Sequence, residues 1–63
     1  MELIDAAKSL KNEVGDRGFV GVGLGRIFVY VYAPKRKWYG DVPKTWEGHP
    51  VHWEFGVGRI VAA

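Results

Sequence analysis

The feature that most constrains this chain is an alternation of residue types over residues 19–32. The run Phe-Val-Gly-Val-Gly-Leu-Gly is followed by Arg-Ile-Phe-Val-Tyr-Val-Tyr. Successive side chains of a β-strand point to opposite faces, and β-branched and aromatic residues favour strands. Glycine tolerates the positive φ of tight turns. The pattern therefore predicts a β-hairpin over residues 19–32, with its turn near residues 23–26.

With Leu24 and Gly25 in the turn, the hairpin has two sides of different chemistry. A one-residue slip of the pairing would mix the two sides, so the pattern specifies which residues share a side. This register pairs Val22 with Ile27, Val20 with Val29, Phe19 with Tyr30, and Gly21 with Phe28. The aliphatic side carries Val20, Val22, Ile27, Val29 and Val31. The aromatic side carries Phe28, Tyr30 and Tyr32, whose rings can lie across Gly21 and Gly23.

Residues 2–14 are predicted to form an amphipathic helix that covers the aliphatic side. Its apolar stripe has helical spacing and consists of Leu3, Ala7, Leu10 and Val14, widened by Ile4 and Ala6. Gly15 is placed to end the helix as a left-handed cap. A helix of this length is marginal alone, so its stripe must pack on the hairpin.

The remainder of the chain is less regular. Pro34 ends the second strand, because proline donates no ladder hydrogen bond. Residues 33–50 are predicted to be an irregular loop, in which residues 42–47 could form one helical turn. Residues 50–61 alternate again and predict a strand or a bent strand pair. The fold class is α+β: one N-terminal helix packed on a small antiparallel sheet of three to four strands, in a single domain spanning 1–63.

Several short motifs carry a resemblance to a known module. They are Val20-Gly21-Val22-Gly23-x-Gly25, Ile27-x-Val29-Tyr30-Val31, Val42-Pro43, Gly48-x-Pro50-Val51 and Gly58-x-Ile60-x-Ala62. Over roughly residues 14–62 the chain resembles a small α/β module found beside bacterial trypsin-like serine peptidases, and short stand-alone chains of bacteria and their phages. The resemblance implies the fold and a bacterial or phage origin, and it brings no catalytic residue with it.

Composition narrows the function classes. The chain has no cysteine, which removes disulfides and thiolate metal sites. The net charge of +2 is too small to imply nucleic acid by itself. Its N-terminal region carries Glu2 and Asp5 and lacks the long apolar run of a signal peptide or membrane span. We therefore expect a cytoplasmic protein with no membrane partner.

The candidate chemical motifs are weak. The glycines of residues 21–25 have the wrong spacing for a dinucleotide fingerprint and lead into another strand. His49 and His52 would face opposite ways on an extended segment, which does not suit a zinc site. Ser9 and Thr45 have no evident His–carboxylate partner. His52 and Glu54 share a strand face and could pair as a base and its orienting group, or simply as an exposed pair. We expect no catalytic residue, metal or cofactor, and no enzymatic activity.

Two binding functions remain. The favoured one is protein–protein contact or self-association, most simply as a homodimer, through aromatic residues or a sheet edge. Its predicted contact residues are Phe28, Tyr30, Tyr32, Trp38 and Trp46. The alternative is nucleic-acid binding, because cations interleaved with aromatics suit a phosphate backbone and stacked bases. Its predicted contact residues are Lys35, Arg36, Lys37, Tyr39 and Lys44.

Overall fold

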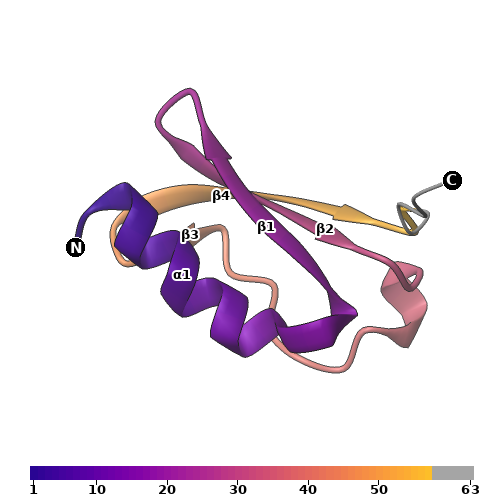
Figure 1. Ribbon diagram of the computed structural model, residues 1–63. Coiled ribbons are helices and arrows are strands. Elements are labelled where there is room, and N and C mark those ends of the chain that lie inside the picture. The colour runs from indigo at the N-terminus through magenta and orange to yellow at the C-terminus, as the bar shows by residue number, and fades with distance from the viewer. Residues whose placement is uncertain (58–63) are drawn as a thin grey trace, which may run out of the picture.

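The computed structural model describes residues 1–57, in which an α-helix covers one side of a mixed four-stranded sheet (Figure 1). The elements are α1 Leu3–Val14, β1 Gly18–Gly23, β2 Arg26–Val31, β3 Thr45–Trp46, β4 His49–Phe55, and the single 3₁₀ turns η1 Gly15–Arg17 and η2 Lys35–Lys37. The strand order is β1-β2-β4-β3. The predicted α+β class, with its N-terminal helix on a small sheet, is confirmed.

The hairpin forms in the predicted register. Val22 pairs with Ile27, and Phe19 pairs with Tyr30. Leu24 has φ 53° and Gly25 has φ 74°, as expected for a tight turn whose two central residues both have positive φ. Leu24 adopts this conformation without the freedom of glycine, and its side chain is 92% exposed. The alternation of residue types therefore determined both the pairing and the faces.

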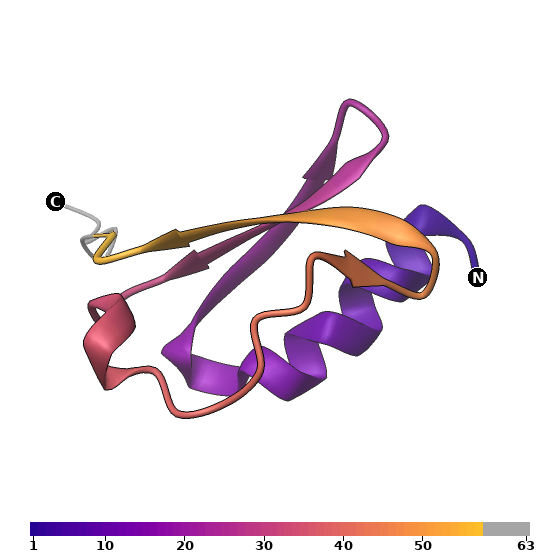
Figure 2. The ribbon, with the colours of Figure 1, turned by 180° about the vertical axis from the view of Figure 1, so that it is seen from behind.

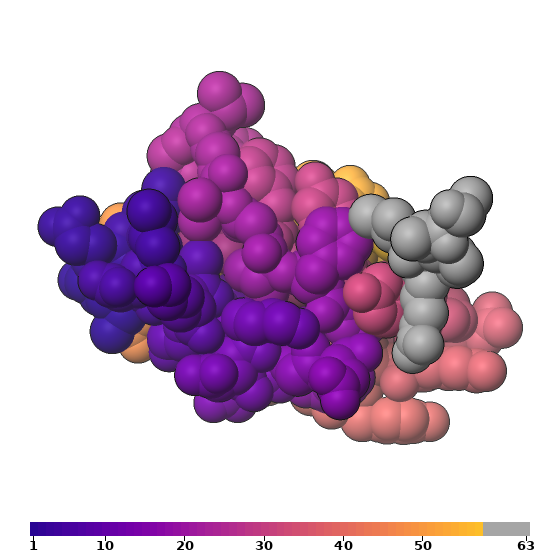
Figure 3. Space-filling view, in the orientation of Figure 1, coloured from indigo at the N-terminus to yellow at the C-terminus, as the bar shows by residue number. Residues whose placement is uncertain are grey.

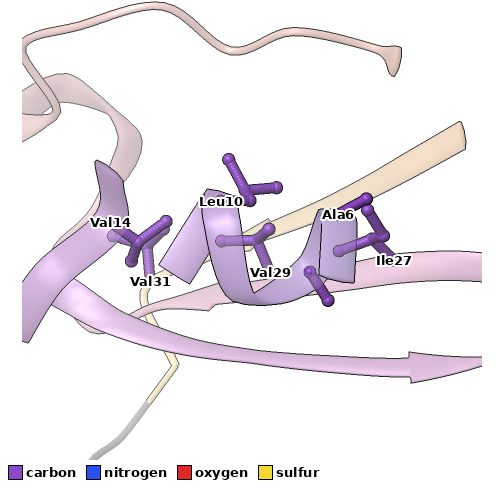
Figure 4. Close-up of a cluster of buried hydrophobic side chains, with 7 residues drawn as sticks. Ala6, Leu10, Val14, Ile27, Val29 and Val31 are labelled. Atoms are coloured by element: carbon purple, nitrogen blue, oxygen red, sulfur yellow. The ribbon is translucent and has the colours of Figure 1, made fainter. Parts of the chain in front are cut away.

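Helix α1 packs on the aliphatic side of the hairpin and forms the core there (Figure 4). The fully buried or nearly buried residues are Ala6, Ala7, Leu10 and Val14 from α1, and Ile27, Val29 and Val31 from β2. Gly15 ends the helix with a positive φ of 61°, as predicted, but its ψ of −137° differs from that of the left-handed helical cap that was expected. Ile4 was expected to widen the buried stripe, and this is wrong: its side chain is 59% exposed. The stripe turns toward Ala6 and leaves Ile4 beyond the edge of the sheet.

The fully antiparallel sheet was a wrong prediction, because β4 runs parallel to β2, with Val29 beside Trp53. A parallel pair needs a crossover connection of roughly a dozen residues or more. Residues 32–48 are this connection, which runs from the end of β2 back to the start of β4. The predicted helical turn over 42–47 is also wrong. In its place are β3 and a turn in which Glu47 and Gly48 have positive φ. Of the predicted strand 50–61, residues 50–55 belong to β4, and residues 58–61 lie outside the described part.

The crossover connection lies on the same side of the sheet as α1 (Figures 1 and 2). Trp53 and Phe55 share the buried face of β2 through the parallel register. The Trp38 ring lies 5.6 Å from that of Trp53 and 5.9 Å from that of Phe55. The Trp53 indole N–H donates to the Pro43 carbonyl at 2.8 Å. The helix and the connection thus cover one side of the sheet together.

Candidate interaction surface

The other side of the sheet has no helix or loop of residues 1–57 packed on it. We call this surface the aromatic face. It comprises Phe19, Gly21 and Gly23 of β1, Arg26, Phe28 and Tyr30 of β2 with Tyr32 just beyond it, and His52 and Glu54 of β4. None of these residues belongs to the core cluster or to the apolar residues packed against it. The surface is produced by topology: the helix and the crossover connection both use the opposite side.

The rings of the aromatic face lie against one another. Phe19 stacks on Tyr30 with ring centroids 4.8 Å apart, and Phe28 stacks beside Tyr30 at 6.4 Å. Phe19 and Tyr32 are 6.3 Å apart, and Phe28 meets the His52 ring edge-on at 5.8 Å. These contacts span β1, β2 and β4 and leave each aromatic side chain partly exposed. The result is a continuous strip of ring surface whose geometry is fixed by the strands beneath it.

Part of the aromatic face carries no side chain, because Gly21 and Gly23 occupy two of its positions on β1. A Cβ added at Gly23 would meet the Phe28 ring at 3.6 Å, whereas a Cβ added at Gly21 would meet nothing within 4 Å. The predicted packing of rings over glycines therefore holds for Phe28 above Gly23 but not for Gly21. Gly21 marks an open position beside the ring strip, where a side chain from another molecule has room.

Charged groups lie at one end of the ring strip and along its β4 side. Arg26 begins β2 beside the turn and is exposed. On the β4 side, beside Tyr30, the Glu54 carboxylate lies 2.7 Å from the His52 Nε2, with about half of each side chain exposed. Arg26 and Glu54 are separated along the strands by about 13 Å, from a rise of ~3.3 Å per residue. The aromatic face thus has a positive charge at its turn end and a carboxylate on its β4 side, beside Tyr30.

The structure separates the five aromatic residues predicted to form one contact surface. Phe28, Tyr30 and Tyr32 lie on the aromatic face, whereas Trp38 and Trp46 pack against the core on the opposite side. The Arg17 guanidinium lies 3.9 Å from the centre of the Trp38 ring and covers it further. Trp38 and Trp46 therefore belong to the crossover connection that covers the other side of the sheet. The prediction that all five residues form a single contact surface is wrong.

The predicted nucleic-acid contacts are all accessible. Lys35, Arg36 and Lys37 form η2 and are exposed, as is Lys44. Tyr39 is 84% exposed. The neighbouring Trp38 is turned inward, so Tyr39 is left as the exposed ring of this segment. The structure brings Lys35, Arg36 and Lys37 together on η2, and places Tyr39 two residues after this turn and Lys44 further along the connection.

Residues 1–57 contain no group of three or more His, Asp or Glu side chains arranged to hold a metal ion. The His49 Nε2 lies 2.6 Å from the Met1 carbonyl, and His52 bonds Glu54 on the open sheet surface rather than in a cleft. None of the helices in this part of the chain has the length and apolar character needed to cross a bilayer.

Some members of the aromatic face were not among the predicted contact residues. Phe19 was paired with Tyr30 but was not selected as a contact residue, and Arg26 was not selected either. His52 and Glu54 join the surface because β4 pairs with β2 in parallel, with His52 beside Phe28. Their alternation with Val51 and Trp53 showed that they shared a face; the sequence did not show which face of the hairpin they would extend.

Comparison of the chain with protein-family models, with curated proteins and with solved structures gives no match. The resemblance to the module found beside trypsin-like peptidases therefore stays a prediction.

Proposed function

We propose that this chain is a small binding module, without enzymatic activity, whose aromatic face makes protein–protein contact, most simply with a second copy. The observation that carries this proposal is the open, ordered strip of rings on a sheet whose other side is fully used. Tyr and Phe surfaces of this kind anchor interfaces, because each ring buries a large area with little loss of conformational freedom.

The charge pattern favours a second copy as the occupant. A two-fold axis in the plane of the interface can reverse the strand direction of one copy relative to the other. Arg26 of each copy would then lie near Glu54 of the other, and the two ring strips would meet between these charges. The same surface is therefore complementary to itself, which is the requirement for a symmetric dimer.

The size of the surface sets the strength expected. Three strands spaced ~4.8 Å apart and about six residues long cover roughly 300 Å² in plan, well below the ~800 Å² per partner of a standard stable interface. We therefore expect a weak, reversible dimer, with dissociation in the micromolar range or above. A nanomolar dimer would need more surface than the aromatic face provides.

Gly21→Arg tests the proposal without disturbing the core. The open space at Gly21 accommodates the new side chain, and alternation directs it onto the aromatic face. We expect the weight-average mass from light scattering to fall from a concentration-dependent value to that of a monomer, while the circular dichroism spectrum is unchanged. Asn12→Arg is the matched control, because it adds the same charge on α1, and we expect it to leave the mass unchanged.

A second pair of variants removes rings instead of adding bulk. Tyr30→Ala should weaken the dimer, whereas Tyr39→Ala, at an 84% exposed site in the connection, should not. If the wild-type chain is monomeric at millimolar concentration, self-association is refuted. If the mass depends on concentration but neither Gly21→Arg nor Tyr30→Ala changes it, the aromatic face is not the interface.

A second candidate function is single-stranded nucleic-acid binding, favoured by the exposure of η2 and Tyr39. Three phosphate contacts from Lys35, Arg36 and Lys37 would give a log–log salt slope of about −2 for a single strand. Fluorescence polarisation of a labelled oligonucleotide, with all three residues changed to Ser, tests this. Equal affinity of the two proteins at low salt would exclude the route.

A further inference from the structure

A different surface, the outer edge of β1, has backbone groups free for pairing. β1 is the last strand of the sheet, and no other strand within residues 1–57 pairs with its outer side. The Tyr32 N–H donates to the Arg17 carbonyl at 3.0 Å. In an antiparallel pair such bonded positions alternate with unbonded ones. The peptide groups of Phe19 and Gly21 therefore point to β2, and those of Val20 and Val22 point outward.

A lysine already occupies one end of this edge. The Lys11 ammonium donates to the Gly18 carbonyl at 2.9 Å and to the Gly15 carbonyl at 2.6 Å. Gly18 is the next outward-pointing residue before Val20, so its acceptor is satisfied by a side chain. No hydrogen bond within residues 1–57 uses the outward N–H and C=O groups of Val20 and Val22. An edge with this many free groups is a template for strand addition.

A groove of about 390 Å³ runs between this edge and α1. Both walls, α1 and β1, lie on the surface seen in Figure 3. The charged residues that line the groove are Lys8 and Lys11, with no carboxylate among the lining residues. Toward the hairpin turn the exposed apolar side chains are Ile4, Val22 and Leu24, at 59%, 43% and 92%. The adjoining hollow at this end is also lined by Glu2 and Asp5. The basic part of the groove is therefore the part beside Lys8 and Lys11.

We propose that the β1 edge binds an extended acidic segment of another protein by strand addition. The backbone of that segment would pair with Val20 and Val22, because main-chain hydrogen bonds supply affinity in this mode of recognition. Its acidic side chains would lie beside Lys8 and Lys11, and an apolar side chain would lie beside Ile4.

Charge decides between this occupant and a second copy. Antiparallel pairing of two β1 strands about Gly21 would place both α1 helices on the same side of the joined sheet. Lys8, which lines the groove beside Gly21, would then face Lys8 of the other copy near the two-fold axis, where like charges repel. An acidic segment meets the same lysines with attraction. The inference is independent of the aromatic face, since the free peptide groups lie in the plane of the sheet.

The probe is a fluorescein-labelled heptapeptide with threonine at odd positions and glutamate, glutamate and valine at even positions. We expect saturable anisotropy binding to the wild-type chain at low salt. Methylating the amide nitrogens of one alternate set of residues should abolish binding, and methylating the other set should leave it, because a strand presents alternate N–H groups to its neighbour. Equal binding by both methylated peptides, or no binding by the parent peptide, would overturn the proposal.

Protein variants locate the site. Val22→Pro removes an outward N–H at a position where an edge strand tolerates proline. This variant should abolish peptide binding, whereas Val22→Thr should not. Lys8→Glu should weaken binding about threefold to tenfold, and the remote Lys35→Glu should not. Gly21→Arg retains binding if the two surfaces are separate. Hydrogen-exchange protection of Val20 and Val22 in the wild-type chain without peptide would instead assign the edge to a second copy and refute the acidic-segment proposal.

Discussion

Two glycines of β1 should respond in opposite ways to the same substitution. Gly18→Ala places a methyl group where the structure has no space for it, because an ideal Cβ would lie 2.2 Å from the Tyr30 carbonyl oxygen. An ordinary carbon–oxygen contact is ~3.3 Å or longer, so the base of the hairpin must open by about 1 Å. Gly21→Ala meets nothing within 4 Å.

The expected magnitudes follow from these contacts. Opening the hairpin at Gly18 lengthens the bond from the Tyr32 N–H to the Arg17 carbonyl, now 3.0 Å, beyond a useful distance. Overpacking costs about 1–3 kcal/mol and a lost hydrogen bond about 0.5–1.5 kcal/mol, so we expect a loss of about 2–4 kcal/mol. Gly21→Ala should gain about 0.5–1 kcal/mol, because glycine is unfavourable within a strand.

Urea unfolding, followed by tryptophan fluorescence and by circular dichroism, measures both changes. A chain of this size is expected to have a free energy of unfolding of roughly 3–9 kcal/mol, so Gly18→Ala removes a large part of it. Gly21→Ala serves as the matched control for the change in residue type. Equal stability of the two variants would refute the register and the openness of the aromatic face together.

Three further substitutions test other parts of the structure. Leu24→Asn should stabilise the chain by about 1 kcal/mol, raising the melting temperature by ~4–8 °C, because Asn-Gly suits a turn with two positive φ values; an unchanged melting temperature would contradict this. Ile27→Ala should cost about 2–5 kcal/mol in urea unfolding, since Ile27 of β2 is fully buried in the core that β2 forms with α1, and a cost below 1 kcal/mol would argue against this core. Trp53→Phe removes the donor to the Pro43 carbonyl and should cost about 1 kcal/mol, with faster proteolysis within residues 38–46; an unchanged cleavage rate would show that this bond does not hold the connection.

The hairpin was predictable because its information is local. Alternation with a period of two fixes which residues share a face, and glycine at position 25 fixes where the chain can turn. The helix was predictable for the same reason, apart from Ile4, whose exposure depends on how far the sheet extends beneath the helix. These parts needed no knowledge of distant contacts.

The placement of β4 was not predictable from its own residues. Alternation showed that Val51, Trp53 and Phe55 share a face, but the same pattern suits parallel or antiparallel pairing with either strand of the hairpin. The outcome depends on the path of residues 32–48, which their irregular sequence does not specify. That path also decided that Trp38 and Trp46 would cover the aliphatic side, and so left the aromatic side open.

The most direct test of the account follows the ring proton resonances of the wild-type chain by NMR across a dilution series. If the aromatic face mediates self-association, the Phe28 and Tyr30 ring signals shift with concentration, while those of Trp38 and Trp53, on the covered side, stay constant. The concentration dependence should match that of the mass from light scattering. Phe28 and Tyr30 signals that do not move while the mass rises, or shifts confined to the tryptophan rings, would contradict the central claim.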